Sequence, residues 1–176
     1  VSCYSGTNGN VELKGIGGVP PYHYRLDEER WNGSPLQIGL GAGEYLPQVM
    51  DQNGCIFALR RITVQQPPPV KVDLGEDITI ALGQDTSLAA LISDAVAPLS
   101  LRWADDGTEW LSCMDCETPD VIQLYFTRPF ALEVKDARGC IGRDEVVVQV
   151  EKDNLIFVPT GFSPNDDGNN DLLWVH

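Results

Sequence analysis

The chain has 176 residues, of which 12 are Lys or Arg and 26 are Asp or Glu, and its formal net charge is −14. Hydrophobic residues make up 43% and charged residues 22%, which is typical of a folded protein of one or two domains. The negative charge would repel phosphate backbones and anionic lipids, so nucleic acid is not an expected partner. The sequence has no basic and apolar leader and no apolar run near about 18 residues. We therefore expect no transmembrane segment, and we interpret the chain as part of a longer protein.

Two tyrosines, Tyr22 and Tyr24, flank His23 in a stretch that is expected to form a strand. Alternate residues of a strand point to the same face, so the two tyrosines share one face. That face could stack on a carbohydrate ring, but packing inside a small sandwich is the favoured interpretation.

A pattern then occurs twice in the chain. The stretch "YLPQVMDQNGCI" covers Tyr45 to Ile56, and "FALEVKDARGCI" covers Phe130 to Ile141. Both contain an aromatic residue followed by Val, Asp, Gly, Cys and Ile at the same positions. Each copy predicts a strand, a tight turn at Gly and a returning strand.

Three prolines, Pro67 to Pro69, follow the first hairpin and indicate a short stiff linker. They divide the chain into a unit at residues 1–67 and a second at residues 68–152. Short alternating runs separated by Gly and Pro predict an all-β fold of tandem small antiparallel β-sandwiches of the immunoglobulin-like type. Trp103 stands where that fold places its core tryptophan.

The five cysteines suggest two disulfides, one free thiol and an oxidising, extracytoplasmic setting. Cys3 and Cys55 lie at the two ends of the first unit. A bridge between them would join its opening strand to its closing hairpin, and the loop-entropy model gives such a bridge at most about 4 kcal/mol.

The second unit has Ala81 on the early strand where a partner for Cys140 would be expected. This leaves Cys113 and Cys116 to form a local bridge, and Cys140 as a buried free thiol that acts as a small core hydrophobe. A reactive thiol is the alternative for Cys140, but no histidine accompanies it. The pair Cys113 and Cys116 also has zinc-ligand spacing, although the chain offers no second pair of ligands.

No motif for catalysis accompanies these features. The sequence lacks a nucleophile elbow, a phosphate-binding Gly-Lys motif and a histidine beside a plausible nucleophile, so we expect no enzyme activity. Trp31 and Trp110 lie in polar, turn-rich stretches. They are the candidate ligand-binding aromatic residues, and partial burial under a loop is the alternative for both.

The stretch "NDDGNND" near the end of the chain is a candidate calcium loop. It places Asn165, Asp167, Asn169 and Asp171 at alternate positions, with Gly168 allowing the backbone to bend. The pattern resembles the front half of an EF-hand loop without its distal Glu. A plain Asx turn is the alternative, and no other cofactor is expected.

The first unit resembles the SprB repeat of Bacteroidetes surface proteins over nearly all of residues 1–67. The resemblance rests on the opening Cys3, the stretches "GGVPPYHY" and "LGAGEYLPQVMDQNGC", and the closing "ITVQQP". The second unit is similar to the PKD-related, immunoglobulin-like modules beside such repeats, through "VDLGEDITIALG", Trp103 and "LSCMDCETP". That pattern commonly has Cys at the position of Ala81, so the chain departs from it there.

The end of the chain, "FVPTGFSPNDDGNNDLL" within residues 153–176, looks like the start of a gliding-motility-associated C-terminal sorting domain. The resemblance implies export by type IX secretion to the cell surface or the medium. It also implies the secretion machinery and neighbouring modules as partners, with surface glycans as a further possibility. The expected function is a non-catalytic structural and adhesive segment. The alternative is an accessory carbohydrate-binding module of a secreted polysaccharide-degrading enzyme.

Overall fold

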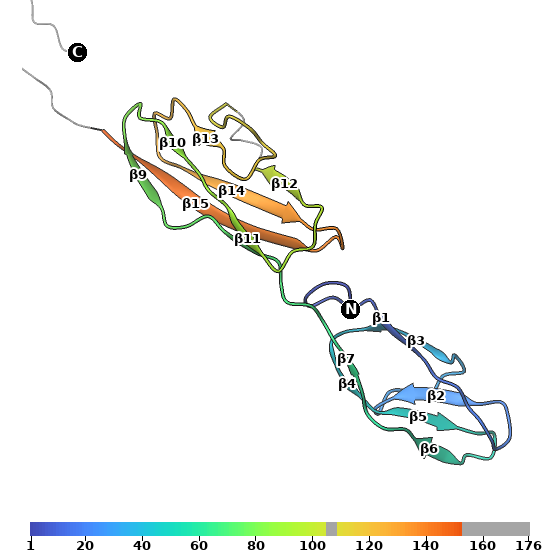
Figure 1. The fold of residues 1–176 in the computed structure, drawn as a ribbon. Coiled ribbons are helices and arrows are strands. Elements are labelled where there is room, and N and C mark those ends of the chain that lie inside the picture. Colours follow the sequence, from blue (N-terminus) through green and yellow to red (C-terminus); the bar gives the residue numbers. More distant parts are fainter. Residues whose placement is uncertain (105–108, 153–176) are drawn as a thin grey trace, which may run out of the picture.

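A computed structural model describes residues 1–104 and 109–152 of the chain, and every regular element in these ranges is a β-strand (Figure 1). Within them, no helix is long and apolar enough to cross a membrane. The buried hydrophobic residues form two clusters, one on each side of the prolines at positions 67–69. We call the parts that contain them the first module (residues 1–66) and the second module (residues 70–152).

The first module has seven short strands: β1 (Gly9–Glu12), β2 (His23–Leu26), β3 (Leu36–Leu40), β4 (Gly43–Tyr45), β5 (Pro47–Met50), β6 (Ile56–Ala58) and β7 (Ile62–Val64). They pair antiparallel in the orders β2-β5-β6, β1-β3 and β4-β7. The core is small, and its buried members are Leu13, Tyr24, Leu26 and Leu40. Tyr22 packs against them, so the inner-face interpretation of the two tyrosines is confirmed.

The second module contains β8 (Lys71–Asp73), β9 (Ile78–Ala81), β10 (Thr86–Ser87), β11 (Leu91–Ser93), β12 (Ser100–Trp103), β13 (Asp120–Val121), β14 (Arg128–Lys135) and β15 (Ile141–Glu151). One sheet has the order β12-β14-β15-β9, in which β9 runs parallel to β15. The pairs β8-β11 and β10-β13 lie on the other side of the core. This topology is that of an immunoglobulin-like sandwich and confirms the predicted fold class.

Trp103 lies at the centre of the second core with no exposed surface. Its ring packs among buried residues from both sides of the sandwich, and its indole Nε1 donates to the Cys116 carbonyl at 2.9 Å. A buried indole N–H needs such an acceptor, because leaving it unpaired would cost free energy. The core position predicted for Trp103 is therefore confirmed.

The repeated sequence pattern forms two hairpins with the same register. In the first module Val49 is opposite Phe57, and in the second Val134 is opposite Gly142. Each pair lies two residues from the ends of the turn that joins the strands. The two predicted hairpins are confirmed, and this shared register allows residues of the two modules to be matched one to one.

Candidate functional site: the disulfide-linked module junction

The turn of the first hairpin is organised by a buried carboxylate. Asp51 Oδ1 accepts from the amides of Asn53 at 3.0 Å and Cys55 at 2.9 Å. The Asp51 carbonyl accepts from Gly54 N at 3.0 Å, and Gly54 has a φ of 79° that favours glycine. Asp51 Oδ2 accepts from Val19 N at 3.1 Å, so the same side chain also holds the neighbouring loop.

The second module repeats this arrangement. Asp136 Oδ1 accepts from Arg138 N and Cys140 N, both at 2.9 Å, and the Asp136 carbonyl accepts from Gly139 N at 2.9 Å. Asp136 Oδ2 accepts from Val96 N at 3.3 Å, as Asp51 does from Val19. Cys140 is therefore the structural counterpart of Cys55.

Both carboxylates are held in the charged form. Hydrogen bonds from backbone amides, above all that of Cys55, lower the pKa of Asp51 below its ordinary value of 3.8. For Asp136, burial acts to raise the pKa. The amides of Cys140 and Val96 and the Arg138 side chain, 2.9 Å away, outweigh it, so the pKa of Asp136 is lowered. Each turn is thus fixed by an ionised side chain at neutral pH.

A disulfide joins the two modules at this turn. Cys3, in the loop before β1, is bonded to Cys140, with their Cα atoms 5.4 Å apart. Ser2 O lies 3.3 Å from the sulfur of Cys140. The loop that carries Cys3 is tied to the residue just before the linker, because Ser5 N donates to the side chain of Gln66 at 2.9 Å. The first module is therefore held to the second both by the linker and by a second covalent bond. Figure 1 shows the N-terminal loop beside the linker.

The predicted pairing of Cys3 with Cys55 is wrong, and so is the assignment of Cys140 as the free thiol. Val1 N donates to the Gln65 carbonyl at 2.8 Å, which places Cys3 at the end of the first module where the chain leaves it. Cys55 is in the turn between β5 and β6, which lies at the opposite end of the module in Figure 1. The ten residues from Cys55 to Gln65 can span up to about 30 Å when extended. Cys140 is buried as expected, but it is bonded, and the exposed Cys55 is the free thiol.

The remaining cysteine predictions have mixed outcomes. Cys113 and Cys116 form the predicted local disulfide. Ala81 does not lie opposite Cys140, because β9 pairs parallel with the end of β15 and Ala81 is beside Glu151. A cysteine at residue 81 would therefore be at the far end of the strand from Cys140.

The two candidate ligand-binding tryptophans lie in different modules and are both partly buried. The Arg25 guanidinium lies over the Trp31 ring at 4.4 Å from its centroid, and that of Arg128 lies over Trp110 at 4.3 Å. Trp110 also makes an edge contact with Phe126, with the ring centroids 5.3 Å apart. The two rings do not form a shared platform, and one face of each is already covered by an arginine.

The four predicted calcium ligands, Asn165, Asp167, Asn169 and Asp171, lie outside the described residues. Within the described residues, no group of three or more His, Cys, Asp or Glu side chains is placed to hold a metal ion. Sequence reasoning missed the role of the two turn aspartates. The signal was present, because Asp and Cys have the same four-residue spacing in both copies of the repeat.

No protein-family model matches the chain, and no curated protein matches it. Among solved structures it is similar to the PKD domain of the KIAA 1837 protein, with 23% identity, a TM-score of 0.39 and coverage of 56% of this chain and 100% of that one. It is also similar to the fibronectin(III)-like modules of Clostridium thermocellum CbhA, with 11% identity, a TM-score of 0.38 and coverage of 90% and 93%. A third is the eight-domain N-terminal part of Down Syndrome Cell Adhesion Molecule, with 14% identity, a TM-score of 0.41 and coverage of 82% and 26%. The fold assignment rests on the strand topology, and these likenesses add nothing about function.

Proposed function

We propose that this chain is a non-catalytic structural and adhesive segment of a cell-surface or secreted protein, in which rigid sandwich modules space or present other parts of the molecule. The observation that carries the proposal is the disulfide between Cys3 and Cys140, which joins two separately packed modules. A bond of this kind adds little to either core. Its effect is to restrict how one module moves relative to the other.

The linker and the disulfide together restrict the relative motion of the two modules more than the linker alone would. The linker contains three consecutive prolines, which favour an extended and stiff backbone. A chain joined only there could still swing about the linker. The second bond, at the turn held by Asp136, removes much of that freedom, as a spacer that transmits force or sets a distance requires.

The proposed setting is the cell surface, reached by type IX secretion. Two disulfides support an oxidising environment outside the cytoplasm. The resemblance of residues 157–173 to a sorting domain supports the export route, with the secretion machinery as the partner of that region. Calcium binding by Asn165, Asp167, Asn169 and Asp171 remains part of the proposal for the same region.

The rival function, an accessory carbohydrate-binding module, depends on Trp31 and Trp110. Arg25 and Arg128 already cover one face of these rings, which favours a structural role. A glycan array with wild-type protein and Trp31→Ala and Trp110→Ala variants tests this. We expect no glycan signal that depends on either ring, and specific binding lost on substitution would support the rival.

Residual dipolar couplings in solution test the spacer function. If the junction is rigid, the amides of both modules fit one alignment tensor. We expect this for the oxidised protein, and we expect two tensors of different magnitude for Cys140→Ser. The matched control is Cys55→Ser, which removes a thiol from the corresponding turn and should leave one tensor. Independent alignment of the modules in the oxidised wild-type protein would contradict the proposal.

A further inference from the structure

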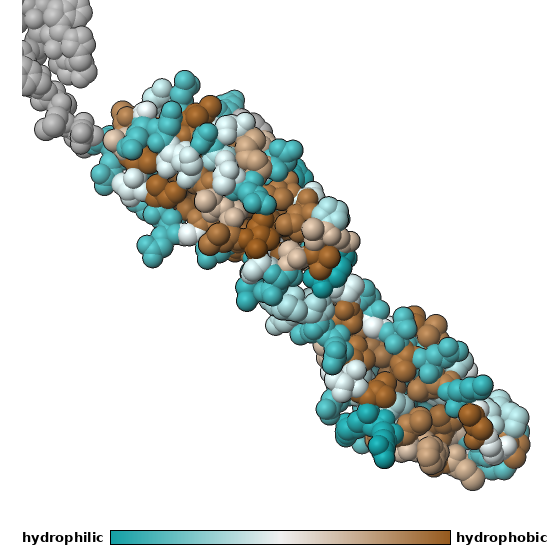
Figure 2. Space-filling view, in the orientation of Figure 1, coloured by the Kyte–Doolittle hydropathy of each residue, from teal (hydrophilic) through white to brown (hydrophobic). Residues whose placement is uncertain are grey.

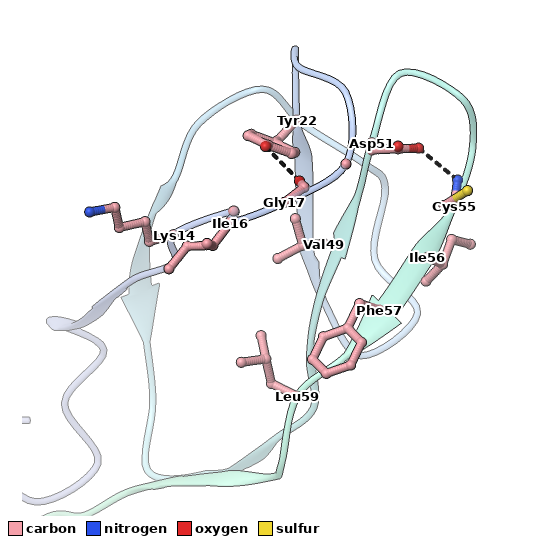
Figure 3. Close-up of a pocket in the computed structure, with 12 residues that line it drawn as sticks. Lys14, Ile16, Gly17, Tyr22, Val49, Asp51, Cys55, Ile56, Phe57 and Leu59 are labelled. Carbon is pink, nitrogen blue, oxygen red and sulfur yellow. Dashed lines mark hydrogen bonds between the residues drawn. The ribbon is translucent and has the colours of Figure 1, made fainter.

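The first module has an open apolar groove beside the turn that contains Cys55 (Figure 3). Its volume is about 440 Å³. Three side chains on its rim are far more exposed than hydrophobic residues usually are: Ile16 at 85%, Phe57 at 70% and Ile56 at 55%. Figure 2 shows apolar side chains gathered over the part of the first module where Figure 1 places β6.

The second module shows what occupies the corresponding place. Val19 and Val96 each donate to the turn aspartate of their module, and the carbonyl of each accepts from the residue after that aspartate. The two valines are therefore equivalent, and a residue before Val19 matches the residue numbered 77 higher in the second module. The segment 14–16, on one side of the groove, then corresponds to β11. Likewise residues 56–59, on the other side, correspond to residues 141–144 at the start of β15. In the second module β8 lies between these two segments.

Strand β8 is firmly held there. It pairs antiparallel with β11, and Leu74 N just after it donates to Asp144 Oδ2 at 2.8 Å. Val70 and Leu74 on either side of the strand are buried. Without β8, the second module would be open between β11 and the start of β15, where the first module has its groove.

The groove of the first module also has backbone groups suited to a strand. Leu13 N donates to the Pro35 carbonyl at 2.8 Å, toward β3. Residues 14–16 match β11, and successive amides of a strand point to opposite sides. We infer from this matching that the amides of Lys14 and Ile16 face the groove. In the second module the residue matching Lys14 is Leu91, which lies opposite Asp73. A strand with an acidic residue there would place a carboxylate opposite Lys14.

We propose that this groove binds a β-strand with the pattern of Val70 to Leu74, apolar at alternate positions and acidic at the position of Asp73. The strand would run antiparallel to residues 14–16 and complete the sandwich. Its source is polypeptide that leads into Val1. The direction fits, because such a strand starts at the Cys55 end and finishes where Val1 contacts Gln65.

Several residues differ between the two sites. The apolar Leu59 stands where Asp144 accepts from Leu74 N in the second module, and the largest change in shape is at Gly142. Gly142 in the second module has Val70 directly over it, and its counterpart in the first module is Phe57. A Cβ at Gly142 would lie 2.7 Å from the Val70 carbonyl oxygen, so a strand bound over Phe57 must lie farther out than β8 does. It packs on the Phe57 ring, where β8 crosses a glycine. The ring is 70% exposed without the strand, and its burial is an expected result of binding.

A labelled synthetic peptide of residues 69–76, added to the full chain, tests the proposal by fluorescence anisotropy and hydrogen exchange. We expect saturable binding and slowed exchange at the amides of Lys14 and Ile16. Ile16→Asp and Phe57→Asp should each weaken binding at least about tenfold. The control is Ile38→Asp, which changes a residue 73% exposed on β3 outside the groove and should leave binding unchanged.

A tethered strand removes the dependence on peptide affinity. By the same matching, Val1 corresponds to Ile78, and β8 lies within the residues just before Ile78. The variant therefore carries a copy of residues 66–77 fused directly before Val1. We expect a higher melting temperature of the first module and burial of Phe57. The same extension with Asp at its copies of Val70 and Val72 should give neither. Absence of both effects would overturn the proposal. The proposal would also be overturned if the added peptide slowed hydrogen exchange only at residues 91–93. Self-association of the chain through Ile16 and Phe57 would overturn it as well.

Discussion

At the scale of single residues, Asp136 connects the turn to the module junction. Its carboxylate accepts from the amide of Cys140, which bears the disulfide, and from that of Val96 in the adjacent loop. Asp51 has the corresponding contacts with Cys55 and Val19. The two positions differ in two respects: Cys140 is bonded to Cys3, whereas Cys55 remains an exposed thiol. The Arg138 side chain also donates to Asp136, and Asp51 has Asn53 at the matching place.

The lowered pKa of Asp136 makes stability depend on pH. A carboxylate whose pKa is lower in the folded state stabilises the fold above its unfolded pKa, near 3.8. That stabilisation is lost as the pH falls through 3.8 toward the folded pKa. Asp136→Asn should therefore unfold more readily than wild type at pH 7, and the difference should shrink as the pH drops below 3.8.

Thermal unfolding between pH 2.5 and 7 measures this effect. The control is Glu28→Gln, which removes an exposed carboxylate from a loop of the first module. This variant should have nearly the same melting temperature as wild type at pH 7, and its melting temperature should change with pH in nearly the same way. A difference between Asp136→Asn and wild type that stays constant down to pH 2.5 would show that ionisation of Asp136 is not the cause.

At the scale of elements, the seating of β8 on β15 depends on the absence of a side chain at Gly142. A Cβ at that position would lie 2.7 Å from the Val70 carbonyl oxygen and 3.0 Å from a methyl group of Val72. Because a backbone atom is in the way, β8 must shift. Gly142→Ala should lower the free energy of unfolding of the second module by about 1–3 kcal/mol, measured by urea denaturation.

Gly33→Ala is the matched control for this substitution. A Cβ at Gly33 would meet no atom within 4 Å, and its φ is not in the left-handed region. It should leave the stability within about 0.5 kcal/mol of wild type. If Gly142→Ala were as well tolerated as Gly33→Ala, the close packing of β8 on β15 would be contradicted.

Local patterns in the sequence were enough to predict the hairpins and the core tryptophan. Asp and Gly at fixed spacing define the turn at residues 51–55, and strand alternation places Tyr24 inward. These features depend on neighbours within a few residues. The sequence also matched the two turns to each other, which is the basis for comparing Cys55 with Cys140.

The cysteine pairing could not be predicted in the same way, because it depends on which end of a module each residue occupies. Cys3 and Cys55 lie at opposite ends of the first module, although both are close to the limits of its sequence. Likewise Ala81 is far from Cys140 because β9 pairs with the end of β15. Strand direction and register decide both distances, and neither is visible in spacing alone.

At the scale of the whole molecule, two small cores follow one another along the chain and a disulfide joins them. Each module packs its own hydrophobic residues. Loss of the bond should therefore change the freedom of the junction more than the folding of either module. The first module differs from the second in having an open groove where the second has β8. The groove and Cys55 lie at its end away from the junction, where a further element could be joined.

Peptide mapping without reduction tests the joining of the modules most directly. Free thiols are alkylated at acidic pH, and the protein is then digested with trypsin. We expect residues 1–14 to be recovered in a disulfide with residues 139–143, and the alkyl group to be on Cys55 within residues 31–60. Recovery of residues 1–14 joined to residues 31–60, with Cys140 alkylated, would show that the bond lies within the first module and would contradict the proposed spacer.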